Sequence, residues 1–161
     1  MKMRRSDREV LDISRVYKFL LEEDVMRLAF ADDEGLYIVP VNYGCTLDDE
    51  TFDFYIHGAD EGRKAAALKK AAKDGSEIAF EIDGHHEAFN SNSCNASYYY
   101  ASVIGKAHVK LLEGEEKTAG LKHLMDGIMP AAEYVFNDNI LEKMMVCRLT
   151  ATEWSCKQHS R

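Results

Sequence analysis

Three closely spaced runs of aromatic and β-branched residues, at positions 25–31, 36–45 and 51–57, do most to limit how this chain can fold. Short stretches rich in aspartate, glutamate and glycine separate the runs, which is typical of strands joined by turns. The last run alternates between apolar and more polar residues, and this alternation puts His57 on the more polar face. We therefore expect a meander of three antiparallel strands, paired in chain order.

The remaining segments predict three helices and three further strands. Asp12 is a suitable N-cap for a helix whose apolar residues recur at helical spacing, and an alanine-rich helix is expected to stop at Gly75. The expected helices are residues 12–23, 61–73 and 115–129, and the expected further strands are residues 77–82, 97–112 and 144–154. Strands that mostly neighbour one another in sequence predict a mainly β fold with peripheral helices, an antiparallel barrel with helices at its ends and sides.

Length and charge limit the functions open to the chain. Its 161 residues fit a single domain, residues 1–161, with no internal repeat or low-complexity linker. The net charge of -8 argues against general binding to nucleic acid or to an anionic membrane, but a local cationic pocket stays possible. The apolar stretches are far shorter than the roughly 20 residues that span a bilayer, and the basic N-terminus has no secretory apolar core. We expect a cytoplasmic protein.

Cysteine and histidine spacing gives little sign of a metal site. The four cysteines lie far apart and form no C-x-x-C pair, so we expect free thiols. His85 and His86 are adjacent and point in different directions, and no partner four residues away completes a ligand set. We expect no bound metal.

Pro40 interrupts the second run of strand-forming residues. A proline removes one hydrogen-bond donor from a sheet, so its position requires a strand edge or a bulge. An ordinary edge strand would satisfy this requirement. Alternatively, exposed backbone groups between Val39 and Asn42 meet the edge of a planar ligand.

Two cations, Arg63 and Lys64, fall where a strand is expected to turn into the second helix. Cations oppose the helix dipole at an N-terminus, and a bound phosphate would resolve this conflict. Screening by Glu61 and by solvent would resolve it equally well. The segment is not a P-loop, because Ala65 stands where that motif requires serine or threonine, and no G-x-G-x-x-G motif is present.

A third feature is the tyrosine cluster at residues 98–100, which leads into the long strand expected at 97–112. Tyrosine combines apolar area with a hydroxyl group and is favoured at wet pockets and interfaces, although a half-exposed strand would use it too. Taken in order with residues 3–9, 39–44 and 55–64, this cluster resembles the 5-nitroimidazole resistance (Nim) family, which belongs to the pyridoxamine 5'-phosphate oxidase-like flavoproteins. The similarity covers nearly the whole chain.

The resemblance implies an antiparallel split β-barrel of the FMN-binding type, working as a homodimer with each flavin at the subunit interface. His57 matches the family's site histidine near the flavin face, where an imidazole can steer a substrate or transfer protons. Without the resemblance, His57 would be a strand-end histidine exposed to water. By the same match, Val39, Pro40, Val41, Asn42 and Tyr43 would line the isoalloxazine edge, Arg63 and Lys64 would grip the phosphate, and Ser102 and Val103 would touch the flavin.

As a function, the resemblance implies an FMN-dependent oxidoreductase that reduces 5-nitroimidazoles or similar small aromatic compounds. The flavin would supply the redox chemistry and the protein would supply orientation, electrostatics and solvent exclusion. A flavin-binding sensor, carrier or electron-transfer module without such turnover is the alternative from another class, because fold does not fix function. A third interpretation, a pyridoxamine 5'-phosphate oxidase-like enzyme, needs a second cationic clamp that the sequence does not clearly offer.

Overall fold

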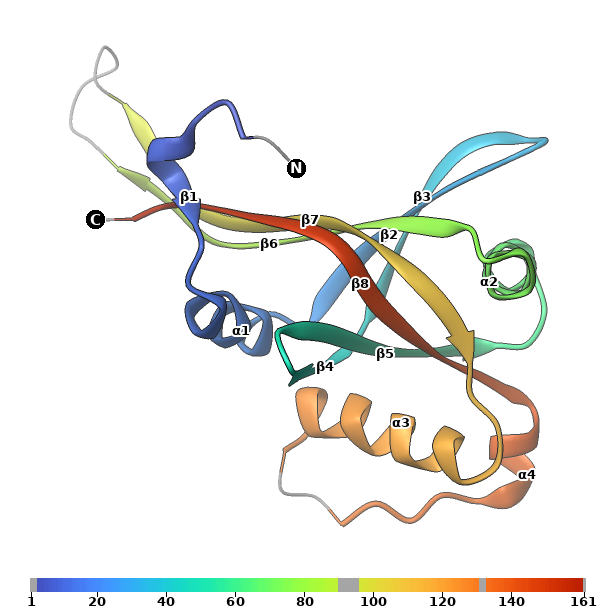
Figure 1. The fold of residues 1–161 in the computed structure, drawn as a ribbon. Coiled ribbons are helices and arrows are strands. Elements are labelled where there is room, and N and C mark those ends of the chain that lie inside the picture. The colour runs from blue at the N-terminus through green and yellow to red at the C-terminus, as the bar shows by residue number, and fades with distance from the viewer. Residues whose placement is uncertain (1–2, 90–95, 131–132, 161) are drawn as a thin grey trace.

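The computed structural model describes residues 3–89, 96–130 and 133–160, which form an eight-stranded antiparallel sheet with helices at its ends and sides (Figure 1). The strand order is β3-β2-β6-β7-β8-β5-β4, and β1 pairs with β8. The strands are β1 (Glu9–Val10), β2 (Val25–Asp32), β3 (Gly35–Asn42), β4 (Gly44–Asp48), β5 (Thr51–Ala59), β6 (Glu77–Phe89), β7 (Ser97–Leu111) and β8 (Met144–His159). The helices are α1 (Ile13–Glu22), α2 (Arg63–Asp74), α3 (Gly114–Ile128) and α4 (Asp138–Glu142), and a 3-10 turn (Ser6–Arg8) precedes β1. This arrangement confirms the predicted split barrel.

The helix signals in the sequence are confirmed. The Asp12 carboxylate caps α1, accepting hydrogen bonds from the backbone N–H groups of Ser14 at 2.9 Å and Arg15 at 3.3 Å. Gly75 ends α2 in the left-handed conformation, at φ 73°, which glycine adopts without steric cost. The third helix also lies within one residue of its predicted span.

The first three runs pair in chain order as predicted, but they do not form one meander, because the second run breaks at Tyr43. Its first part, β3, pairs with β2, whereas its second part, β4, pairs with β5 at the opposite end of the strand order. The side chain of Tyr43 is buried, and its hydroxyl donates a 2.6 Å hydrogen bond to the carbonyl of Leu20 in α1. Two hairpins therefore replace the meander, and the chain crosses between them at this residue.

The strands β6 and β8 also extend past their predicted ends at residues 82 and 154. Beyond Ile82 the side chains are mostly polar, but their backbone still pairs with β7 after a bulge between Gly84 and Glu87. The resulting arm of β6 and β7 projects beyond the rest of the sheet (Figure 1). Strand β1 and helix α4 are too short to give a periodic signal, and the sequence did not predict them.

The predicted edge position of Pro40 and the predicted free cysteines are confirmed within the described residues. Pro40 lies in β3, the first strand of the order, so it occupies a sheet edge as predicted. Cys45, Cys147 and Cys156 are free and buried, and Cys94 lies outside the described residues. No helix in the described part of the chain is long and apolar enough to cross a membrane.

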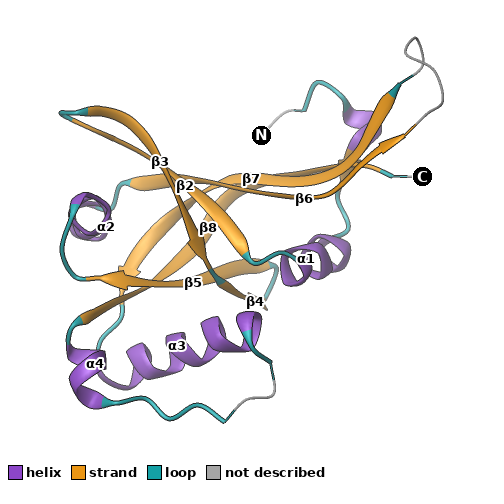
Figure 2. Cartoon of the chain, turned by 180° about the vertical axis from the view of Figure 1, so that it is seen from behind, coloured by secondary structure: helices purple, strands orange, loops and turns teal. Residues whose placement is uncertain are grey.

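Two groups of buried apolar residues hold the elements together. The larger fills the barrel and includes Phe52, Phe54 and Ile56 of β5. The smaller joins α3 to the outer side of β5 and β8 and includes Tyr55 and Leu124. Helices α3 and α4 lie along the β5 side of the sheet (Figure 2), and α4 lies beside His57.

Candidate functional site

His57 lies near the end of β5, opposite Val146 of β8. Because successive side chains of a strand alternate, His57 faces away from the barrel core that Ile56 enters. There it lines a cavity of about 440 Å³ whose other walls are Gly58 and Ala59 of β5, Asn139 and Ile140 of α4, Lys143 at the end of α4, and Met144. The predicted site histidine thus borders a hollow of the size that small ligands occupy.

The surroundings of His57 favour its neutral form. His57 is exposed, but the protein around it still removes part of the water from its imidazole. This desolvation lowers the pKa of the imidazole, and the positive charge of Lys64 lowers this pKa further. A neutral imidazole has one nitrogen that donates a hydrogen bond and one that accepts. At neutral pH, therefore, His57 can meet either kind of polar group on a ligand.

Lys64 occupies a space that glycine leaves open. A Cβ atom added to Gly58 would lie only 2.8 Å from the ammonium nitrogen of Lys64, so the missing side chain makes room for this cation at the end of β5. The first turn of α2 contains no acidic residue, and its N-cap, Gly62, has no side chain to accept from the helix amides. No carboxylate of the described residues forms an ion pair with Lys64. Free amides and a free ammonium group therefore gather where an anion would bind.

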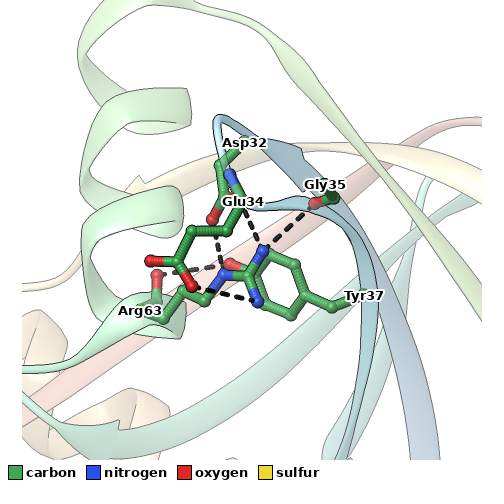
Figure 3. A network of polar contacts seen from close by, with 5 residues as sticks. All are labelled: Asp32, Glu34, Gly35, Tyr37 and Arg63. Atoms are coloured by element: carbon green, nitrogen blue, oxygen red, sulfur yellow. Dashed lines mark hydrogen bonds and ion pairs between the residues drawn. The ribbon is translucent and has the colours of Figure 1, made fainter.

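The guanidinium of Arg63 points instead to the tip of the β2–β3 hairpin (Figure 3). It donates to both carboxylate oxygens of Asp32, at 2.6 and 2.5 Å, and to the carbonyl of Gly35 at 3.1 Å. The Cζ atom of Arg63 lies 3.8 Å from the ring centroid of Tyr37, which is a cation–π contact. This pairing lowers the pKa of Asp32. Arg63 thereby fastens the hairpin to the start of α2, and its main donors already have acceptors.

The five residues predicted to line the isoalloxazine edge, 39–43, differ in how far their side chains are exposed. Val41 and Tyr43 are buried in the core and Val39 is half-buried, whereas Pro40 and Asn42 are exposed. The amide of Asn42 donates to the carbonyl of Asp24 at 3.0 Å. A ligand at this place would meet two exposed side chains and the free backbone edge of β3.

Ser102 and Val103 lie in the middle of β7, away from His57. Ser102 pairs with Lys157 near one end of β8, whereas His57 pairs with Val146 near the other end. Val103 is fully buried, and its strand pairs with β6 on one side and β8 on the other, so this chain leaves no part of Val103 open to a ligand. The fold thus separates the predicted site residues of one chain into two groups.

Sequence reasoning missed several residues around this site. Asn139, Ile140 and Lys143 come from a helix of one turn, which has no recognisable periodicity. Asp32 and Tyr37 hold Arg63 through contacts that only the folded hairpin creates. Among residues 3–89, 96–130 and 133–160, no group of three or more histidine, cysteine or acidic side chains could hold a metal ion.

These features define an antiparallel split β-barrel with cationic groups at one end of β5. The chain belongs to the pyridoxamine 5'-phosphate oxidase family, whose model matches residues 12–158. No curated protein sequence matches the chain.

Solved structures share the fold at low sequence identity. A protein from Bacteroides thetaiotaomicron named for 5-nitroimidazole antibiotic resistance is 22% identical, with a TM-score of 0.78 over 93% of this chain and 86% of that one. A FAD and heme binding protein from Mycobacterium smegmatis is 17% identical, with a TM-score of 0.82 over 96% of this chain and 74% of that one. The flavocytochrome Anf3 from Azotobacter vinelandii is 19% identical, with a TM-score of 0.79 over 99% and 73%.

We predict that His57 titrates below the ordinary histidine pKa and that Lys64→Gln moves its pKa back upward, because the substitution removes a neighbouring positive charge. Because the pKa of His57 is lower in the folded state than in the unfolded state, protonation favours unfolding. His57 therefore lowers the free energy of unfolding as the pH falls below the ordinary histidine pKa. NMR titration of the imidazole in wild type, Lys64→Gln and the exposed control Lys73→Gln measures the shift. An unchanged pKa in Lys64→Gln would contradict the electrostatic coupling.

Proposed function

We propose that this protein is a homodimeric FMN-dependent oxidoreductase that reduces small nitroaromatic compounds such as 5-nitroimidazoles. The observation that carries the proposal is the unpaired ammonium of Lys64 beside the free amides of α2, at the strand end that also bears His57. Family membership supports the same cofactor class. The flavin-binding proteins among the structural neighbours add support from the fold alone.

The phosphate of FMN suits the start of α2. A phosphate group needs several hydrogen-bond donors and positive charge, and Lys64 together with the first amides of α2 supplies both. The space beside Gly58 keeps the ammonium close to the strand. Arg63 would join as a direct ligand only by giving up Asp32, so we assign it first to holding the β2–β3 hairpin, which carries Val39–Tyr43, against this site.

His57 would act on the substrate side. FMN, when bound, supplies the redox chemistry by taking electrons from a reduced donor and passing them to the acceptor. The neutral imidazole can orient a bound aromatic compound by a hydrogen bond and can deliver a proton near neutral pH. Gly58 and Ala59 add no bulk beside it, which leaves room for a planar molecule.

A homodimer explains how Ser102 could touch the same flavin as Lys64, whereas Val103, which is fully buried, stays behind it in the core. The two groups lie toward opposite ends of β8 in one chain, so a second chain would bring its own β7 against the first chain's α2. The outer face of the sheet offers the necessary apolar surface, because Leu36 is 88% and Ile38 66% exposed and Ile104 lies on the same face. Arg27 on this face is already paired with Glu81 and Asp83.

The second candidate function is a flavin-binding module without turnover, a sensor, carrier or electron-transfer protein. It shares the fold and the phosphate site and differs only in what happens at His57. In that case His57→Ala would leave both FMN binding and reactivity toward nitro compounds unchanged. The oxidoreductase proposal instead expects His57→Ala to retain FMN and lose most nitroreduction, measured as loss of nitro-group absorbance with a chemical reductant of the flavin.

The phosphate assignment predicts that Lys64→Ala weakens FMN binding by about 1.5 to 3 kcal/mol, the usual contribution of a hydrogen bond to a charged group. Arg63→Ala should cost less, because its guanidinium is held by Asp32. Quenching of flavin fluorescence gives the affinities, with Lys73→Ala as the control. Equal losses in the two variants would mean that Arg63 leaves Asp32 to bind the phosphate, and an unaffected Lys64→Ala would remove the assignment.

The shared site predicts complementation between two defective chains. Lys64→Ala and Ser102→Trp should each bind little FMN, at a concentration that saturates wild type. After subunit exchange, about half of the dimers are mixed and each holds one intact site, so about a quarter of the sites should recover. Mass spectrometry of differently tagged chains confirms the exchange. Exchanged mixtures without recovered binding would mean that Lys64 of one chain and Ser102 of the other do not form one shared site.

A further inference from the structure

The cavity beside His57 contains a second cation that the proposed flavin site does not use. Lys143 ends α4 and lines this cavity together with Asn139 and Ile140. The ion pairs of the described residues include none with Lys143, and the described lining of the cavity contains no acidic side chain. The described lining of the cavity therefore carries a positive charge without a compensating carboxylate.

The cavity offers a ligand both polar and apolar side chains. Lys143 and Asn139 provide an ammonium and an amide group, which both donate hydrogen bonds. Ile140, which is 60% exposed, and Met144 provide apolar surface. The acidic residues nearby, Asp60 and Glu142, border a different hollow, on the side of Leu112 and Val146.

We propose that this cavity binds small aromatic carboxylates, with Lys143 as the residue that selects the anionic group. The inference rests on the proposed function for the role of the site but deepens it, because it names an anionic rather than a neutral aromatic substrate class. A single ammonium and one amide match the single charge of a carboxylate better than the two charges of a phosphate ester. The aromatic ring lies against Ile140 and Met144 and reaches His57 at the opposite wall.

The test compares three probes of similar shape that differ in charge: 4-nitrobenzoate, 4-nitrobenzamide and 4-nitrophenyl phosphate. Calorimetry measures their affinities for wild type, for Lys143→Gln and for Lys122→Gln, an exposed lysine of α3 outside the cavity. Each titration is made with saturating FMN and again without it. We expect 4-nitrobenzoate to bind about tenfold tighter than 4-nitrobenzamide to wild type and to Lys122→Gln, as one charge-assisted hydrogen bond provides.

The Lys143→Gln variant should bind the acid and the amide equally while keeping the wild-type affinity for FMN. In addition, 4-nitrobenzoate should shift the NMR resonances of the His57 ring, which places the ligand in this cavity. A preference for the acid that survives in Lys143→Gln, a stronger preference for the phosphate ester, or unmoved His57 resonances would each overturn the proposal. So would a loss of FMN affinity equal to that of Lys64→Ala, because Lys143 would then serve the flavin.

The outcome for FMN is separable from the outcome for the carboxylate. If wild type fails to bind FMN but keeps a Lys143-dependent preference for 4-nitrobenzoate, the oxidoreductase proposal fails and the carboxylate site stands. If FMN binds normally and the preference is absent, the carboxylate site fails and the oxidoreductase proposal stands.

Discussion

The hydroxyl of Tyr43 donates its hydrogen bond to a carbonyl in the last turn of α1, where helical carbonyls have no partner within the helix. Leaving that carbonyl unpaired in the core would cost about 1 to 3 kcal/mol. The bond fixes the residue at which the chain leaves β3 and enters β4. The rest of the architecture depends on this crossing, because it separates two hairpins that would otherwise pair as one meander.

Gly44, the first residue of β4, lets α3 lie close to this strand. A Cβ atom there would lie 2.1 Å from the carbonyl oxygen of His123, so glycine alone lets α3 approach β4 so closely. Tyr55 and Leu124 then seal α3 onto β5. The partly buried Leu141 of α4 packs against the same cluster, which holds α4, and with it Lys143, near the end of β5.

The distribution of charge separates structural cations from those available for ligands. Arg63 is held by Asp32, and Arg27 by Glu81 and Asp83, so these guanidinium groups stabilise the sheet and the hairpin. Lys64 and Lys143 have no such acceptors among the described residues. Lys143 lines the cavity of His57, and the Lys64 ammonium lies over Gly58, the next residue of β5. Two cations that no carboxylate neutralises near this end of β5 give an acidic protein local sites for anions.

Local signals predicted the elements and the neighbours of the first three runs, but not the break that separates β3 from β4. The cap at Asp12, the stop at Gly75 and the edge position of Pro40 follow from single-residue chemistry, which the sequence displays directly. The break at Tyr43 depends on a partner in α1 and a contact with α3, which no local pattern contains. The same holds for the site: the helix dipole argument identified Lys64, but only the folded hairpin revealed that Arg63 is engaged.

The position of β8 links the two halves of the site and sets a requirement for function. One end of this strand lies beside His57, and the other lies beside Ser102, so both groups depend on one continuous element. The core fixes the sheet of a single chain, so the residues around His57 and those around Ser102 cannot contact the same small ligand within one chain. In two copies related by a two-fold axis, the His57 end of β8 in one chain would meet the Ser102 end of β8 in the other, and this contact would occur twice. The dimer would then have two equivalent sites, so the proposed flavin site requires the proposed dimer.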